Sequence, residues 1–278
     1  MFERWWTSTL ACTPRADNCA MSRDRELIMG SWIDRLEWDE TLARILAWAA
    51  AREHRAVCVC NVHSVVTARS DAALRAAVNG ADLVTPDGMP VAWLIGRRRG
   101  ARQARINGPD LTIALCREAA ARGISVAFYG STQESLARLR VELAQRFPAL
   151  RVAATISPPF RALETAETKA FCRQISDCGA GLVFVGLGCP KQEIWMADNR
   201  YQISAVTLGV GAAFEFIAGT VRRPPVWMQR LGLEWLGRLW AEPRRLWRRY
   251  LVTNSVYTGY VLHELLTGRR HNTRRRDA

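Results

Sequence analysis

Short apolar runs alternate with longer segments of helical periodicity from residue 57 onward, and this alternation leaves few folds open to the chain. The apolar runs have the length and composition of buried strands and cover residues 57–61, 82–85, 125–129, 152–156, 182–186 and 205–210. The segments with helical spacing cover residues 65–79, 109–122, 133–147 and 163–178. Strands and helices that alternate in this way form a mostly parallel sheet with covering helices. We therefore predict an α/β fold with a Rossmann-like sheet.

Positive charge is concentrated near the C-terminus. The chain of 278 residues has a formal net charge of +13, and nearly all its positive charge is arginine, since Lys169 and Lys191 are the only lysines. Thirteen arginines but only four acidic residues lie between Arg222 and Asp277. We expect this last fifth of the chain to meet an anionic partner.

The eight cysteines form none of the tight pairs that hold zinc, so we expect free thiols in a reducing compartment and no metal. The first twenty residues do not combine a long apolar core with a small-residue cleavage site, which argues against a secretory signal, and Met21 is a candidate start. No uninterrupted apolar stretch reaches the roughly 20 residues that cross a bilayer. These features predict a protein that is soluble or lies on a membrane surface.

A change of composition near Thr220 suggests how the chain is divided. We expect a poorly ordered N-terminal extension over residues 1–23, a main α/β domain over 24–220, a basic and Trp-rich helical appendage over 221–266, and a basic disordered tail over 267–278. Residues 226–250 interleave four tryptophans with six arginines. That mixture suits a membrane interface, a pair of core-packing helices broken at Pro243, or a nucleic-acid surface. The tryptophans favour the membrane.

Asp87 is the first candidate for chemistry. It lies in a Thr-Pro-Asp-Gly sequence directly after a predicted strand, and ligands in parallel sheets bind at the carboxyl ends of the strands. A carboxylate at that place is suited to act as a general base on an acceptor hydroxyl. Pro-Asp-Gly is also a strong turn signal, and spacing alone favours a turn residue.

Glycine turns follow two further strands. Gly130 begins a Gly-Ser-Thr turn ahead of a helix, where backbone N–H groups can hold phosphate. It lacks the spaced glycines of a dinucleotide site and the lysine of a phosphate-binding loop, so NAD and ATP are not the expected ligands. Gly188 permits close backbone approach, and Gln192 is placed to bond a donor group, although a tight turn before a helix explains this segment equally well.

Six blocks in order carry a family resemblance. They cover residues 61–64, 85–88, 105–111, 186–192, 209–214 and 231–236, with Arg238, Glu242 and Pro243 after the last. In these blocks the chain resembles the WecG/TagA/CpsF glycosyltransferases, and the resemblance extends from about residue 27 to residue 250.

The resemblance implies an inverting, metal-independent transferase without a cofactor. It implies a UDP-sugar donor that supplies a hexose, an N-acetylhexosamine or a derived uronic acid, and a polyprenyl-diphosphate-linked saccharide as acceptor. The product belongs to a bacterial surface polysaccharide or a teichoic acid linker. It also implies a peripheral location on the cytoplasmic face of the plasma membrane and self-association. The absence of an Asp-x-Asp pair agrees with a metal-independent mechanism, and protein cations then neutralise the leaving diphosphate.

Site residues carry over by position. Asp87 matches the catalytic base, which outweighs the turn interpretation, Arg105 matches an active-site arginine, and Glu215 matches an acidic residue implicated in nucleotide binding. Arginines of the appendage, which in the family is thought to close over the site and to contact the membrane and the lipid diphosphate, correspond to Arg238, Arg245 and Arg248.

One position departs from the family pattern. Val59 replaces the threonine often found two residues before Asn61, so any hydroxyl role there is either lost or moved to His63 or Ser64. The donor sugar stays open among N-acetylmannosamine, its uronic acid and glucose. Asn61 and His63 are therefore retained as binding candidates. The alternative hypothesis is a non-catalytic, arginine-rich nucleic-acid-binding module; the transferase hypothesis predicts no nucleic-acid partner.

Overall fold

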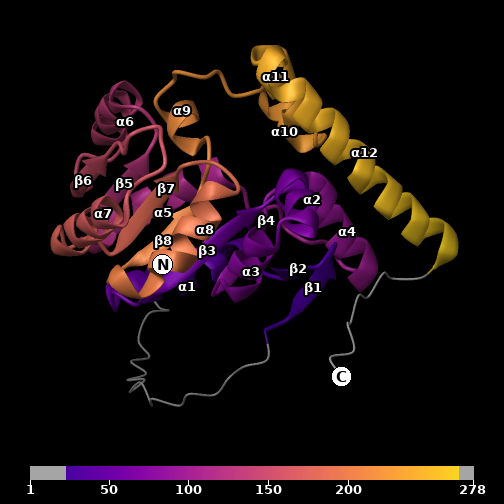
Figure 1. Cartoon of the computed structure of the whole chain (residues 1–278), viewed down its shortest axis with the longest axis horizontal. Coiled ribbons are helices and arrows are strands. Elements are labelled where there is room, and N and C mark those ends of the chain that lie inside the picture. Colours follow the sequence, from indigo (N-terminus) through magenta and orange to yellow (C-terminus); the bar gives the residue numbers. More distant parts are fainter. Residues whose placement is uncertain (1–22, 269–278) are drawn as a thin grey trace, which may run out of the picture.

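A parallel sheet of six strands forms the centre of the computed structural model, which describes residues 23–268 (Figure 1). The strands lie in the order β4-β3-β8-β7-β5-β6, and every neighbouring pair is parallel. Their bounds are β3 (Arg55–Cys60), β4 (Leu83–Pro86), β5 (Val126–Gly130), β6 (Val152–Ile156), β7 (Leu182–Gly186) and β8 (Val206–Gly209). The predicted α/β fold with a parallel sheet is confirmed.

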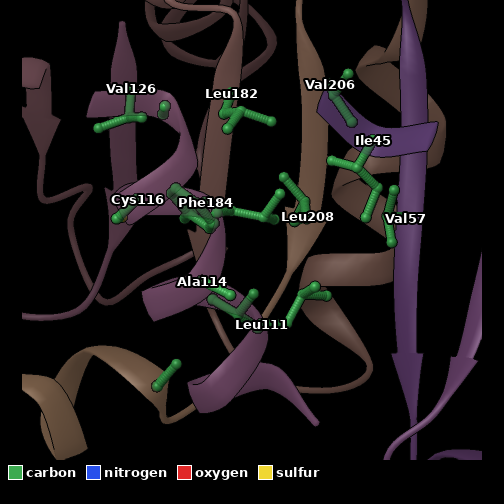
Figure 2. Close-up of a cluster of buried hydrophobic side chains, with 14 of the residues drawn as sticks. Ile45, Val57, Leu111, Ala114, Cys116, Val126, Leu182, Phe184, Val206 and Leu208 are labelled. Atoms are coloured by element: carbon green, nitrogen blue, oxygen red, sulfur yellow. The ribbon is translucent and has the colours of Figure 1, made fainter. Parts of the chain in front are cut away.

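Helices cover both faces of the sheet, because residues within each strand are apolar on both sides. One face packs against α1 (Trp38–Ala50), α5 (Gly108–Arg122), α6 (Gln133–Arg146) and α9 (Ala213–Ile217). Figure 2 shows part of this core, where Ile45 of α1 and Leu111 of α5 lie against strand residues such as Phe184 and Leu208. The other face packs against α2 (Val62–Ser70), α3 (Ala72–Gly80), α4 (Met89–Arg99), α7 (Thr165–Asp177) and α8 (Lys191–Asn199).

Two local features differ from the sequence predictions. The segment 65–79, predicted as one helix, is two helices, because Asp71 accepts a hydrogen bond from the backbone N–H of Leu74 and so caps the start of α3. A hairpin of β1 (Arg25–Ile28) and β2 (Ser31–Asp34) was not predicted. Asp34 accepts a 2.7 Å hydrogen bond from the backbone N–H of Val84, which attaches the hairpin to the edge strand β4.

The appendage consists of α10 (Val226–Arg230), α11 (Glu234–Ala241) and α12 (Pro243–Thr267). The predicted break at Pro243 is the start of α12. This helix runs beside α2 and α4 (Figure 1). Tyr257 donates a 3.0 Å hydrogen bond to the carbonyl oxygen of Pro90, and Arg98 of α4 forms a 2.6 Å ion pair with Glu264.

The described residues allow a statement on membrane-spanning helices and include the inner edges of both predicted tails. Within residues 23–268, no helix combines the length and the apolarity needed to span a bilayer. The predictions for the two tails lie almost wholly outside the described residues. Arg23 and Thr267 are described: Arg23 donates a 2.8 Å hydrogen bond to Asp34, and Thr267 is the last residue of α12.

Candidate active site

A cavity of about 480 Å³ lies at the carboxyl ends of β3, β4 and β8. The appendage closes it, because α11 and α12 contribute side chains opposite the strand ends. Of the predicted site residues, the cavity brings together Asn61, His63, Asp87, Arg105, Gly188, Gln192 and Arg238.

Asn61 and Asp87 are neighbours because of strand register. Cys60 pairs with Pro86 in the parallel β3–β4 ladder, so the residue after each strand emerges at the same edge. Asn61 caps α2 by accepting a 3.2 Å hydrogen bond from the backbone N–H of Ser64 at Oδ1. Its Nδ2 then donates to Asp87 Oδ2 at 3.2 Å. The cap fixes the amide, and the amide orients the carboxylate.

The environment of Asp87 raises the pKa of its carboxyl group. Burial is the largest cause, and the negative charge of Glu234 acts in the same direction. Arg105 and the hydrogen bond from Asn61 oppose them. Arg105 Nη2 lies 3.9 Å from Asp87 Oδ1, and Arg105 Nε donates a 2.6 Å hydrogen bond to the backbone oxygen of Asp87. The Asp87 side chain is still 21% exposed, so it faces the cavity.

Glu234, the first residue of α11, connects the appendage to this site. Its carboxylate forms an ion pair with Arg105 and lies 3.6 Å from Arg223 Nε. Arg223 in turn pairs with Asp110 near the start of α5. Glu234 lies in one of the six family blocks, but the sequence indicated no role for it. Its ion pair with Arg105 depends on how the appendage docks.

His63 lines the cavity as a neutral imidazole at neutral pH. Burial lowers its pKa to about 4, and the positive charge of Arg249 adds to the effect. Thr67 Oγ1 lies 3.2 Å from His63 Nδ1, which holds the ring along α2. A neutral imidazole is suited to hydrogen bonding and not to charge neutralisation.

The side chain of Gln192 joins two turns beside the cavity. Its Oε1 accepts hydrogen bonds from the backbone N–H groups of Gly188 at 3.2 Å and Gly211 at 3.1 Å. Its Nε2 donates to Glu193 at 2.9 Å. Gly188 has a φ of +79°, which a residue with a side chain rarely adopts. Both residues therefore shape the backbone around the cavity.

Three predicted residues do not line the cavity. Gly130 has a φ of +116°, and a Cβ there would lie 2.6 Å from the backbone of Gly186, so this glycine permits close approach of a neighbouring strand. Glu215 accepts a 2.8 Å hydrogen bond from Ser131 Oγ. Arg248 is exposed and stacks over the Trp247 ring at 5.1 Å. The side chain of Arg245 lies outside the described residues. Ligand contacts by these residues stay predictions.

Arg249 lines the cavity, although sequence analysis singled out its neighbour Arg248. Once α12 is known to begin at Pro243, the helical period places Arg249, Thr253 and Tyr257 on one face, and all three line the cavity. Arg238 of α11 also lines the cavity, with its guanidinium 5.5 Å from the Phe216 ring centroid. The cavity thus presents a half-buried carboxylate and several arginines.

Comparison with known proteins agrees with this arrangement. Residues 26–271 match the sequence model of the Glycosyl transferase WecG/TagA/CpsF family. The chain belongs to this family. A relative from Bacillus spizizenii (strain ATCC 23059 / NRRL B-14472 / W23) is 31% identical over 202 residues, covering 71% of this chain and 75% of the relative. That relative is an N-acetylglucosaminyldiphosphoundecaprenol N-acetyl-beta-D-mannosaminyltransferase.

Membership of the WecG/TagA/CpsF family confirms the resemblance seen in the six sequence blocks, and it identifies the chain as a glycosyltransferase. Within residues 23–268, no group of three or more His, Cys, Asp or Glu side chains is placed to hold a metal ion. Independence from metals remains a prediction, as do the donor and the inverting stereochemistry.

Proposed function

We propose that the chain transfers one sugar from a UDP-sugar to a saccharide carried on a polyprenyl diphosphate, with inversion, in the synthesis of a bacterial surface polysaccharide. One observation carries the proposal: an oriented carboxylate, Asp87, faces a cavity whose opposite wall is an arginine-bearing appendage. A transfer between two diphosphate-bearing substrates needs a base for the acceptor hydroxyl and cations for the phosphates.

In the proposed step, Asp87 takes the proton of the acceptor hydroxyl. The hydroxyl oxygen forms a bond to the anomeric carbon on the side opposite the diphosphate. The bond between that carbon and the diphosphate oxygen breaks, and UDP leaves with the electron pair. A single displacement inverts the anomeric centre. The raised pKa of Asp87 strengthens it as a base, since proton affinity rises with pKa.

The leaving diphosphate is neutralised in this proposal by protein cations, and no metal takes part. Arg105 lines the cavity beside Asp87, and we assign it to the leaving diphosphate. Arg238 and Arg249 of the appendage line the same cavity, and we assign them to the lipid diphosphate of the acceptor. Guanidinium groups bind phosphate oxygens through charge-assisted, often bidentate hydrogen bonds. Glu234 holds Arg105 beside Asp87, so the cation lies between the base and the appendage.

The appendage also supplies the proposed contact with the membrane. Trp240 is 88% exposed, and the exposed apolar side chains of the appendage include Trp227, Leu231, Trp247, Leu251, Val252 and Leu266. Arg244 and Arg248 are exposed among them. Apolar side chains enter the acyl boundary while arginine binds anionic head groups, so the chain is peripheral on the cytoplasmic face of the plasma membrane.

The test is a donor panel with purified protein, a synthetic prenyl-diphosphate-linked N-acetylglucosamine, chelator, and UDP-sugars offered singly. We expect acceptor-dependent UDP release with one donor, and UDP-N-acetylmannosamine is the first choice because the Bacillus relative transfers that sugar. N-acetylmannosaminuronic acid and glucose are the next donors. Folded protein that is silent with every donor would contradict the proposal, and salt-sensitive binding to nucleic acid would then support the binding-module alternative.

A further inference from the structure

The residues that line the cavity change from charged to uncharged along its length. Its charged residues lie at the strand ends and at the start of α12. Farther along, it runs between α4 and α12, where its walls include the apolar Met89, Trp93, Val261 and Leu262 and the polar but uncharged Tyr257 and Thr258. None of these six side chains carries a charge. We call this part the α4–α12 groove.

Side-chain contacts fix the position of α12 relative to α4. The hydrogen bond from Tyr257 to Pro90 and the ion pair from Arg98 to Glu264 attach α12 to α4 at two points along the helix. Arg98 also donates a 2.9 Å hydrogen bond to the hydroxyl of Tyr260. Arg97 stacks over the Trp93 ring at 5.8 Å. The walls are therefore fixed by tertiary contacts.

The cavity as a whole, from its charged end through the groove, is long enough to take a chain molecule. Arg249 and Leu262 both line the cavity, and thirteen residues of α-helix separate them, which is about 20 Å at 1.5 Å per residue. At its outer end Trp93 is 49% exposed and Leu262 is 51% exposed. The cavity therefore leads from the arginines beside Asp87 along an uncharged path, which becomes more apolar towards Val261 and Leu262, to the protein surface.

We propose that the α4–α12 groove binds the isoprenoid chain of the acceptor, at the units next to the diphosphate. This inference rests on the proposed function and adds a lipid subsite to it. A prenyl diphosphate is charged at one end and apolar along the rest, and the cavity has the same order of polarity. Because groove and arginines belong to one cavity, a lipid whose diphosphate binds Arg238 and Arg249 has its first isoprene units at Met89 and Tyr257.

The outer face of α12 provides a matched control. Leu251 and Leu262 are both exposed leucines of α12, at 61% and 51%, but only Leu262 lines the groove. Leu262→Glu places a charge in the groove, and Leu251→Glu places the same charge outside it. Because both side chains are largely solvated, each variant is expected to fold, which thermal melting checks.

The first experiment uses water-soluble acceptors, so that no membrane is needed. An N-acetylglucosamine diphosphate with a two-isoprene chain is compared with one that carries only a methyl group. We expect wild type to have a KM at least about tenfold lower for the isoprenoid acceptor, because apolar burial is worth roughly a factor of four per methylene. Leu262→Glu should remove most of this difference and leave the donor KM unchanged, and Leu251→Glu should retain it. Equal KM values for both acceptors in wild type, or equal effects of the two variants, would overturn the subsite.

The second experiment does not depend on turnover. An acceptor with a photoreactive group on its first isoprene unit is irradiated with the full-length protein, and the labelled peptides are mapped by mass spectrometry. We expect label in α4 near Met89 and in α12 near Tyr257. Label on α10 or α11 instead would contradict the groove. Transfer without groove labelling refutes the subsite alone, and groove labelling without transfer by any donor refutes the proposed function alone.

Discussion

Asn61 Nδ2 donates a 3.2 Å hydrogen bond to Asp87 Oδ2, and these two residues are the first after β3 and β4. The bond exists because the strands are parallel neighbours in register. Asn61 is in turn fixed by capping α2. The orientation of the carboxylate thus follows from strand pairing and from the start of one helix, and it leaves Oδ1 on the side of Arg105.

Asp87→Asn should reduce kcat by about 100-fold or more, in the range of a lost general base. The amide oxygen of the variant can still accept from Asn61, so fold and donor binding should be retained. The measurements are turnover with the best donor, UDP-sugar binding by calorimetry, and thermal melting. Turnover equal to that of wild type would rule out Asp87 as the base.

Glu234→Gln should move the acidic limb of the pH profile of kcat/KM to lower pH. The negative charge of Glu234 raises the pKa of Asp87. Glu234 also pairs with Arg105, and the positive charge of Arg105 lowers the pKa of Asp87. Removing the negative charge therefore lowers the pKa of Asp87 in two ways, and the base stays ionised in more acidic solution. The pH–rate profile of kcat/KM measures this.

Glu134→Gln is the control for that shift, because Glu134 lies on the surface helix α6 and its side chain is 73% exposed. It should leave the limb where it is in wild type. A limb that moves to higher pH in Glu234→Gln, or that moves equally in the control, would contradict the coupling of the appendage to the base.

The strands of the sheet could be predicted because each one is marked by a pattern within a short stretch of the sequence. Each strand is a short apolar run, and parallel strands place the residues that follow them at one edge of the sheet, so the sequence alone assigns Asp87 to that edge. The pairing of Arg105 with Glu234 is different, since 129 residues separate them and only docking of the appendage brings them together. Gly130 shows a third case: its place at a strand end suggested phosphate binding, which stays a prediction, whereas its close contact with the backbone of Gly186 depends on strand pairing and could not be predicted.

Arg249 and Arg248 are adjacent residues of α12 for which we expect different functions, substrate binding and membrane binding. Arg249 lines the cavity, whereas Arg248 is exposed beside Trp247. Arg249→Gln should raise KM for the prenyl-diphosphate acceptor by about tenfold or more in a water-soluble assay, because one charge-assisted contact is lost. Arg248→Gln should leave that KM unchanged and weaken sedimentation with anionic vesicles. The reverse pattern would show that the register of α12 over the site differs from the one described.

His63 should make folding stability depend on pH. Its pKa is about 4 in the folded protein and about 6.5 when unfolded, so between these values the unfolded chain binds a proton that the folded protein excludes. Stability is therefore complete above pH 6.5 and is lost as pH falls towards 4. From pH 7 to pH 5 the loss due to this residue is about 2 kcal/mol, since each pH unit is worth about 1.4 kcal/mol.

His63→Gln removes this titration, so urea unfolding at the two pH values should show a fall smaller by about 2 kcal/mol than in wild type. Comparing the two proteins cancels the contribution of carboxylates that titrate in both. Equal losses in wild type and variant would mean that His63 is as solvated in the folded protein as in the unfolded chain. Because burial and Arg249 both keep the imidazole neutral, a smaller loss in the variant would also support the placement of α12 over the active site.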